Sequence, residues 1–227
     1  MKYNKNKVSI IIPAKNEAEG LKKILRSVKP YADDILVVDG NSMDSTKQIT
    51  EEFGARFYLD NGLGRGDAVR IGIKKAKNDY LLFFDADGSH NEKEIPTLLT
   101  PLFENKADAV IGSRRTGGSF DLNNNFWGIL RSGGADFLAY LVNRKFNTNY
   151  SDILYSFRSI KRPIAKKLKL KSDGFEIEQE FVVKMLKNNY KLLEVPTREN
   201  KRGWGKSKLH TITGIKFLIY LLRDLYL

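Results

Sequence analysis

The sequence predicts an α/β fold in which a mostly parallel sheet is covered by helices on both faces. Short apolar runs rich in β-branched residues alternate with segments of helical periodicity between residues 7 and 113. Such alternation is typical of βαβ units, whose strands pair in parallel. Polar residues follow four of the predicted strands, and the carboxyl ends of parallel strands are where α/β sheets bind their ligands.

The predicted strands are brief apolar runs, and the predicted helices have apolar residues three and four positions apart, as at Leu21, Ile24 and Leu25. The strands cover residues 7–13, 33–39, 55–59, 79–85, 107–113 and 190–196. The helices cover residues 18–28, 44–53, 66–77, 92–105, 125–146, 175–189 and 209–227. We expect Pro96 and Pro101 to break the helix over 92–105.

We treat residues 1–227 as one domain, with a nucleotide-sugar-binding half at 1–115, an acceptor-binding half at 116–208 and an apolar helix at 209–227. The helix over 125–146 and the C-terminal helix each have an apolar face, which could lie on a membrane or complete the core. In the first of these helices the predicted apolar stripe consists of Trp127, Leu130, Phe137, Leu138 and Leu141.

The composition is that of a globular protein, with 41% hydrophobic and 29% charged residues. The sequence contains no cysteine, which excludes disulfides and thiolate metal sites. No apolar run reaches the roughly 18 residues of a membrane span. The net charge of +12 favours anionic partners, although a solvated lysine-rich surface has the same signature.

Two acids, Asp85 and Asp87, directly follow the apolar run that ends at Phe84. Neighbouring carboxylates repel each other unless a positive charge lies nearby. Their oxygens are hard ligands that suit Mg²⁺ or Mn²⁺, and a D-x-D pair leaves positions open for phosphates and water. We therefore predict a divalent metal at Asp85 and Asp87. The alternative is a helix-capping acid with a solvated neighbour.

Several motifs resemble those of family 2 glycosyltransferases of the GT-A fold. "VSIIIPAKNEAEGL", "ILVVDGNSMDST", "GLGRGDAVRIGI" and "YLLFFDADGSH" imply a transferase that uses a nucleotide sugar. "SDILYSFR", "GFEIEQEFVVKMLKNNYKLLEVP" and "RGWGKSKL" resemble the dolichol-phosphate mannose synthase branch, which moves a sugar onto a polyprenyl phosphate. The resemblance extends from about Val8 to Leu209.

The resemblance implies roles for individual residues. Asp85 and Asp87 match the metal and diphosphate motif, with Mg²⁺ or Mn²⁺ as cofactor. The residues implied to line the donor nucleotide pocket are Pro13, Glu17, Asp39 and Asp85. The residues implied to bind the acceptor phosphate include Ser132 and Arg202, and those implied in catalysis are Asp87, Arg114, Glu180, Arg202 and Lys208. Arg202 and Lys208 belong to a loop that is expected to close over the donor and acceptor phosphates.

Two further basic residues are candidates on local grounds. Arg65 lies between Gly64 and Gly66 at the predicted start of a helix, where it could contact the donor's phosphates or belong to a plain turn. Arg131 lies one helical turn from Gly128, which occupies the place of a basic residue in the family, and could cover the same face toward the acceptor phosphate.

The sequence departs from the family pattern at other positions as well. Ser89 replaces a common glutamine that gives an extra metal contact, and Gly40 replaces the second acid of the family's "VVDD". Tyr155 and Ser156 stand where the family has Ser-Gly. The role of His90 also stays open between a loop hydrogen bond and a metal contact.

The residues favour a phosphate acceptor. No Ser-His-Asp arrangement is evident, and a phosphate oxygen, whose second pKa is about 6, can attack without a general base. We expect transfer of a hexose from a GDP- or UDP-linked donor to polyprenyl or dolichyl phosphate, with inversion, by a peripheral protein on the cytosolic face of a membrane. The alternatives are a soluble sugar or phosphorylated acceptor, a nucleic-acid-binding protein and a non-catalytic sensor. We expect no nucleic-acid partner, because the basic residues are scattered.

Overall fold

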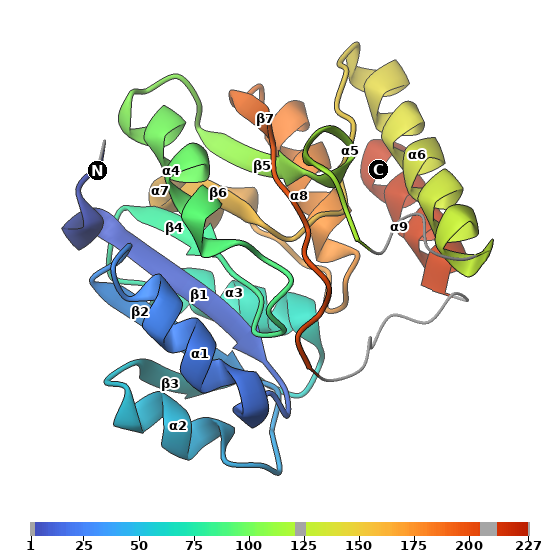
Figure 1. Cartoon of the computed structure of the whole chain (residues 1–227). Coiled ribbons are helices and arrows are strands. Elements are labelled where there is room, and N and C mark those ends of the chain that lie inside the picture. The colour runs from blue at the N-terminus through green and yellow to red at the C-terminus, as the bar shows by residue number, and fades with distance from the viewer. Residues whose placement is uncertain (1–2, 121–125, 205–212, 227) are drawn as a thin grey trace.

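The computed structural model describes residues 3–120, 126–204 and 213–226, apart from the side chains of residues 126–131 and Thr213. A seven-stranded sheet with the order β3-β2-β1-β4-β6-β5-β7 forms the centre of the molecule (Figure 1). The strands are β1 (Val8–Ala14), β2 (Asp34–Asp39), β3 (Arg56–Leu59), β4 (Tyr80–Phe83), β5 (Ala109–Ser113), β6 (Arg158–Lys161) and β7 (Leu192–Pro196). Only the two pairings of β6 are antiparallel among these strands, so the predicted mostly parallel sheet is confirmed.

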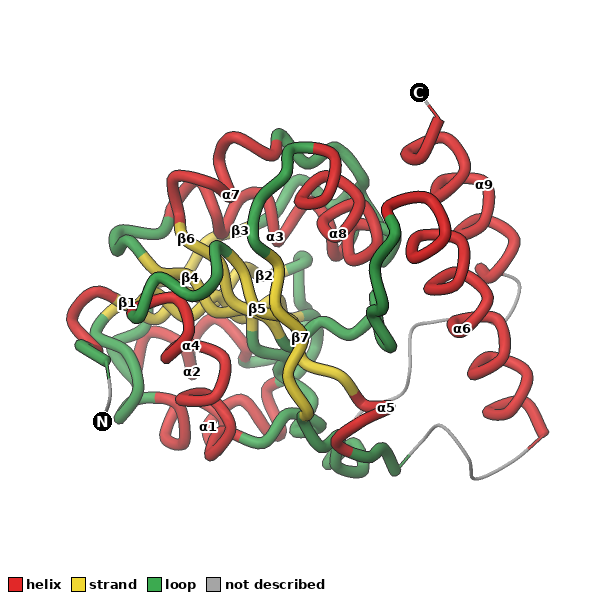
Figure 2. Tube along the Cα trace, turned by 90° about the horizontal axis from the view of Figure 1, so that it is seen from above, coloured by secondary structure: helices red, strands yellow, loops and turns green. Residues whose placement is uncertain are grey.

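Helices cover both faces of the sheet, as predicted. They are α1 (Ala18–Val28), α2 (Thr46–Glu52), α3 (Arg65–Lys75), α4 (Ile95–Phe103), α5 (Arg114–Gly117), α6 (Phe126–Phe146), α7 (Arg162–Leu168), α8 (Ile177–Lys187) and α9 (Thr213–Tyr226), with single 3-10 turns at Lys5–Lys7 and Glu92–Glu94. Figure 2 shows α1, α2 and α4 on one side of the sheet and α3, α7 and α8 on the other. Strand residues alternate between the two layers, so that Ile10 packs with α1 and α4 while Ile11 packs with α3.

Helix α4 is continuous, so the predicted break at its prolines is wrong. Pro96 lies in the first turn, where its missing N–H has no partner within the helix to lose. Pro101 removes one hydrogen bond, but the helix ends at Phe103 soon afterwards. Burial of Leu98 and Leu102 stabilises the helix in spite of that loss.

The helices α6 and α9 lie side by side at one end of the molecule (Figures 1 and 2). Helix α9 completes the core with Phe217, Leu221 and Leu225, all of which are buried. In α6 the predicted apolar stripe is wrong at Phe137, which is 51% exposed, because the buried face is centred on Leu138. Within the described ranges, the structure contains no helix with the length and hydropathy needed to span a membrane.

Candidate active site

Predicted site residues from several strand ends meet at one edge of the sheet. Pro13 lies near the end of β1, Asp39 ends β2, Asp85 and Asp87 follow β4, and Arg114 follows β5. These four strands run in the same direction. Their carboxyl ends therefore open at the edge where α/β sheets place ligands.

Each acid of the D-x-D pair is bound by an arginine. Arg65 Nη2, at the start of α3, lies 2.6 Å from Asp85 Oδ1. Arg202 Nη2, beyond β7, lies 2.8 Å from Asp87 Oδ2. Burial raises the pKa of Asp85, but Arg65, His90 and the hydrogen bond from Ser156 together outweigh this effect and hold the pKa well below its usual range. Two distant parts of the chain thus supply the positive charge that the carboxylates need.

A buried cluster of ion pairs lies behind Asp85. Glu178, in α8, accepts from Arg65 Nε at 2.9 Å and forms a second ion pair with Arg158 Nη2, also at 2.9 Å. Arg158, in β6, is 2% exposed, and its Nη1 donates to the carbonyl oxygen of Glu178 at 2.9 Å. A single carboxylate therefore fixes two arginines, one of which reaches the D-x-D pair.

The carboxylate of Glu180, whose catalytic role stays a prediction, makes contacts other than those of the D-x-D pair. It accepts hydrogen bonds from the backbone N–H groups of Lys171 and Ser172, both at 2.8 Å, and pairs with Lys184 Nζ at 2.7 Å. Residues two apart on a helix differ by about 200° in direction, so Glu178 and Glu180 face different surroundings. Glu178 is the acid of α8 that faces the site, and sequence reasoning missed it.

The predicted nucleotide-binding residues Glu17 and Asp39 lie where the segments that follow β1 and β2 meet. Asp39 accepts from the backbone N–H of Ser42 at 2.8 Å and from its hydroxyl. The Ser42 hydroxyl in turn accepts from the N–H of Asn16 at 2.7 Å. Glu17 follows immediately and precedes α1, with 7% of its surface exposed. Glu17 and Asp39 thus lie close to each other at the edge of the sheet, and their contact with a nucleotide stays a prediction.

Arg114 is fixed by acids from two segments. Its Nε lies 2.7 Å from Asp152 Oδ2, and its Nη1 lies 3.4 Å from Glu199 Oε1. The guanidinium also lies over the Tyr155 ring, 4.8 Å from the centroid. The structure therefore holds a preoriented cation after β5, at the position that the resemblance assigns to phosphate or sugar contact.

Asp152 should make the stability of the protein depend on acid pH. Burial raises the pKa of this carboxyl group, but the charge and hydrogen bonds of Arg114 and the N–H of Leu154 together lower it by more, so the pKa lies below its usual value. The ion pair is complete above the unfolded-state pKa of about 3.9 and is lost as the pH falls through the lower folded-state pKa. Asp152→Asn should lower the free energy of unfolding at pH 7 by about 2 kcal/mol, and this difference should shrink toward pH 2.

Urea unfolding between pH 2 and pH 7 measures this dependence. Asp33→Asn, at an exposed acid before β2, serves as the control and should change the free energy of unfolding by less than about 0.5 kcal/mol. A difference between wild type and Asp152→Asn that is the same at both ends of the pH range would contradict the prediction.

Ser132, predicted to bind the acceptor phosphate, is bound by Arg115. Arg115 Nη1 donates to Ser132 Oγ at 2.6 Å, and Nη2 donates to Ser132 O at 2.8 Å. Arg115 also pairs with Asp136 at 2.5 Å. Sequence reasoning missed Arg115, although the doubled arginine in "GSRR" was a signal that could have found it. The side chain of Arg131 lies outside the described residues.

The residues 197–204, here called the closing segment, cover the D-x-D pair. The N–H of Gly203 donates to Asp87 O at 2.9 Å, and Trp204 Nε1 donates to Ala86 O at 3.0 Å. The indole of Trp204 lies against Gly20 of α1, where a Cβ would come within 1.6 Å of the ring. A side chain at position 20 would therefore displace the closing segment. Lys208 lies outside the described residues.

The comparison with protein families identifies this arrangement. The model of glycosyl transferase family 2 matches residues 9–169, which include the D-x-D pair and Arg114. The chain belongs to glycosyltransferase family 2. This family 2 enzyme is 32% identical over 229 residues to an uncharacterized protein of Methanocaldococcus jannaschii, a match that covers 96% of this chain and 92% of that one.

A second relative is the dolichol-phosphate mannosyltransferase of Pyrococcus furiosus, which is 30% identical over 96% of this chain. The family 2 enzyme spans 63% of that relative's length. Among solved structures, it resembles glucosyl-3-phosphoglycerate synthase of Mycobacterium tuberculosis in complex with Mn²⁺, UDP and glucosyl-3-phosphoglycerate. The TM-score is 0.74 at 17% identity, covering 95% of this chain and 80% of the other. This likeness confirms the predicted GT-A fold.

The donor set of the D-x-D pair fits a divalent cation. Carboxylate oxygens are the ligands that Mg²⁺ and Mn²⁺ prefer, and Mg²⁺ usually binds one or two carboxylates together with phosphates and water. Asp85 and Asp87 supply two such groups. The described part of the chain holds no group of three or more His, Cys, Asp or Glu side chains suited to a metal.

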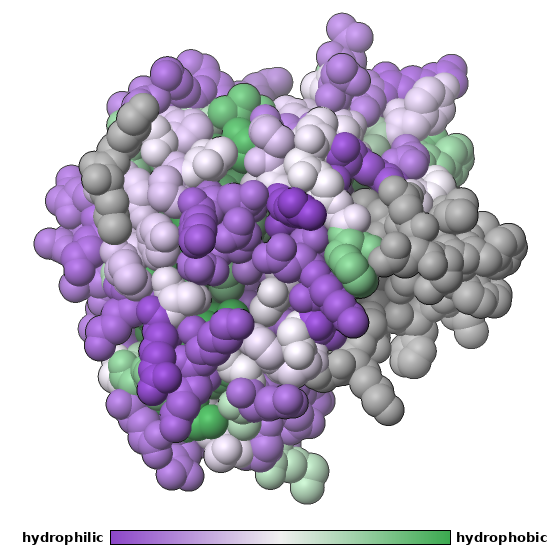
Figure 3. Space-filling view, viewed as in Figure 1, coloured by the Kyte–Doolittle hydropathy of each residue, from purple (hydrophilic) through white to green (hydrophobic). Residues whose placement is uncertain are grey.

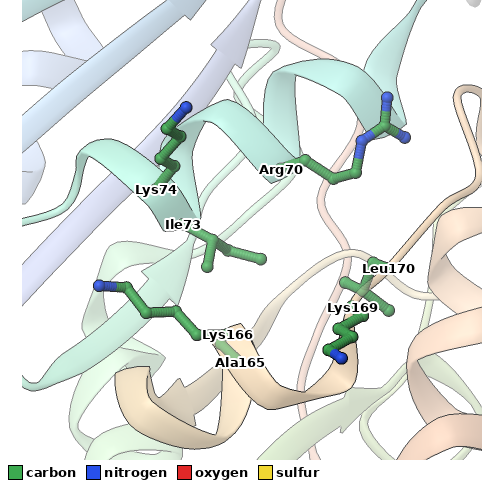
Figure 4. A pocket seen from close by; sticks show the side chains of 7 residues that line it. All are labelled: Arg70, Ile73, Lys74, Ala165, Lys166, Lys169 and Leu170. Carbon is green, nitrogen blue, oxygen red and sulfur yellow. The ribbon is translucent and has the colours of Figure 1, made fainter.

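A separate surface groove lies between α3 and α7, with a volume of about 270 Å³ (Figure 4). Its apolar lining residues are Ile73, Ala165 and Leu170. The basic side chains along it are Arg70, Lys74, Lys166 and Lys169. None of these residues belongs to the predicted active site of the family 2 enzyme.

Proposed function

We propose that this glycosyltransferase moves a hexose from a GDP- or UDP-linked sugar to the phosphate of a polyprenyl lipid at a membrane surface. The observation that carries the proposal is an exposed apolar stripe on α9. It consists of Ile215, Ile219, Leu222 and Tyr226, whose exposed fractions are 69%, 60%, 41% and 68%. A helix that buries one apolar face in the core and exposes a second one is suited to lie in a lipid interface.

The candidate phosphate site lies on the neighbouring helix. Helix α6 carries Ser132, which Arg115 binds, and it exposes Phe137 and Tyr140 to 51% and 52%. An arginine fork suits a phosphate group, and the exposed aromatic rings suit the start of an apolar tail. The proximity of α6 and α9 therefore supports an acceptor with a charged head and a lipid tail.

The charge of the protein supports a position on the cytosolic face. The chain carries a net charge of +12, and cytosolic leaflets have a negative surface potential that attracts basic proteins. On the stripe itself, Lys145 Nζ of α6 lies 4.5 Å from the centre of the Tyr226 ring. Unlike this apolar stripe, most of the described surface seen in Figure 3 is hydrophilic. Attraction to anionic lipid would thus add to apolar insertion of α9.

The proposed reaction is a single displacement. An ionised oxygen of the acceptor phosphate forms a bond to the anomeric carbon, while the bond from that carbon to the donor diphosphate breaks and its electron pair leaves with the nucleoside diphosphate. No proton is abstracted, because the phosphate is already ionised at neutral pH. Attack from the opposite face inverts the anomeric carbon.

Basic side chains and a metal would stabilise the anions in this reaction. Arg114 and Arg202 are held at the edge of the sheet where the diphosphate would bind. Asp85 and Asp87 would hold Mg²⁺ or Mn²⁺, which neutralises charge that develops on a leaving diphosphate. The manganese in the structurally similar synthase is consistent with this assignment.

Vesicle binding and acceptor choice test the proposal. The wild type should bind vesicles that contain anionic lipid, and salt should weaken the binding because part of the attraction is screened. The double variant Ile215→Ser/Ile219→Ser should bind about tenfold more weakly or worse, because apolar burial is lost. Leu59→Ser is the matched control, since Leu59 is 57% exposed on β3, the outermost strand at the opposite side of the sheet from β7.

The acceptor assay compares a short polyprenyl phosphate with 3-phosphoglycerate, using GDP- and UDP-linked hexoses. We expect transfer to the polyprenyl phosphate. Equal transfer to 3-phosphoglycerate, together with no vesicle binding at low salt, would overturn the lipid acceptor and favour a soluble phosphorylated one.

A further inference from the structure

Asp85 takes part in a closed ring of three hydrogen bonds. Its backbone N–H donates to His90 Nδ1 at 3.1 Å. His90 Nε2 lies 3.2 Å from Ser156 Oγ, and Ser156 Oγ lies 2.7 Å from Asp85 Oδ2. The ring thus begins at the backbone of Asp85 and returns to the carboxylate of the same residue.

The chemistry of these groups fixes the direction of every bond. Because His90 Nδ1 accepts a hydrogen bond from the backbone N–H of Asp85, a neutral imidazole carries its own hydrogen on Nε2. That N–H donates to Ser156 Oγ, which leaves the serine hydroxyl hydrogen for Asp85 Oδ2, an atom that can only accept. His90 Nε2 and Asp85 Oδ2 are 3.6 Å apart, too far for a direct hydrogen bond. Ser156 is therefore the link between the histidine and the carboxylate.

Packing holds the histidine in this orientation. The side chain of His90 is fully buried, with 0% exposed. Its ring stacks on Phe157 at 4.5 Å between centroids and meets the edges of Phe84 and Tyr155 at 5.2 Å and 5.1 Å. An imidazole enclosed in this way cannot turn without opening the core, so it provides a rigid support.

We propose that Ser156, oriented by His90, is a positioning residue that fixes the carboxylate of Asp85 for a divalent cation. Ser156 binds Asp85 Oδ2 and Arg65 binds Oδ1, so an ion that replaced Arg65 would meet a carboxylate whose orientation Ser156 still holds. Ser156 occupies a position where the family pattern has glycine, which has no hydroxyl to offer. The inference rests on the metal site of the proposed function.

Direct measurement of Mn²⁺ binding tests this role. The full chain is titrated with Mn²⁺ in the presence of GDP or UDP, and free Mn²⁺ is followed by electron paramagnetic resonance. Loss of a group that orients a metal ligand typically weakens metal affinity 10- to 100-fold. We expect that loss for Ser156→Ala, and near-wild-type affinity for Ser156→Thr, which keeps the hydroxyl.

The matched control is Ser159→Ala. Ser159 is a buried serine in β6, three residues after Ser156, and its hydroxyl donates to Leu98 O at 2.8 Å, away from the D-x-D pair. Ser159→Ala should lower the melting temperature without changing the affinity for Mn²⁺. Should Ser156→Ala fail to fold, Ser156→Gly removes the same hydroxyl with the residue that the family carries.

Two outcomes separate this inference from the proposed function. If the wild type does not bind Mn²⁺ at all, the metal site of the proposed function is wrong. If the wild type binds Mn²⁺, Asp87→Ala loses binding and the Ser156 variants without a hydroxyl bind as tightly as the wild type, the metal site stands and the positioning role is wrong.

Discussion

Replacing Asp87 with alanine should abolish sugar transfer, with a loss of about 10³-fold or more. Asp87 supplies one of the two carboxylates of the D-x-D pair, and its Oδ2 binds Arg202 at 2.8 Å. Its Oδ1 accepts from the N–H and the hydroxyl of Ser89, at 2.9 Å and 2.6 Å. The substitution therefore removes a candidate metal ligand and also the ion pair with Arg202, while the hydrogen bonds from Gly203 and Trp204 to backbone carbonyls of this loop stay in place.

Single-turnover transfer and metal-dependent nucleotide binding measure this effect. The melting temperature should change by only a few degrees, because Asp87 lies at the sheet edge and not within the apolar core. Asp33→Ala, at an exposed acid before β2, is the control and should keep full activity. Full transfer by the wild type in excess chelator, or an Asp87→Ala variant within tenfold of wild type, would show that no metal acts at this pair.

Glu178→Ala should destabilise the fold by about 3–5 kcal/mol, the cost of removing one partner from a buried ion pair. Glu178 compensates two guanidinium groups, those of Arg65 and Arg158. Arg158 is 2% exposed, and burial already lowers its pKa in spite of the attraction of Glu178. Without the carboxylate, two neighbouring cations would repel each other in a medium that solvates them poorly.

Chemical unfolding of the purified variants measures this loss. Glu104→Ala is a matched control, because Glu104 pairs with Lys106 at the surface, where the two side chains are 39% and 70% exposed. It should cost less than about 1 kcal/mol. A loss for Glu178→Ala as small as that of the control would mean that water or another acid solvates Arg158.

The order of the elements and the edge that carries the site are determined by local sequence. Apolar runs such as residues 33–39 predicted strands that the structure contains, because periodicity depends on which residues of one short segment face the core. The positions of Asp39, Asp85 and Arg114 at one edge also followed, since parallel strands end on the same side. No strand was predicted at β6, because its "RSIK" sequence carries two charged residues. In the structure Arg158 is buried within the sheet, and its ion pair with Glu178 compensates the charge.

The contacts that complete the site were decided by tertiary structure alone. Arg65 and Arg202 reach the D-x-D pair from segments 20 and more than 100 residues away along the chain, and no local pattern encodes such a meeting. The direction of a side chain on a buried helix decided between Glu178 and Glu180, because both acids fit the same sequence motif. The link from His90 through Ser156 to Asp85 likewise exists only because β6 pairs antiparallel with β4 and brings the loop before it to the edge that carries the D-x-D pair.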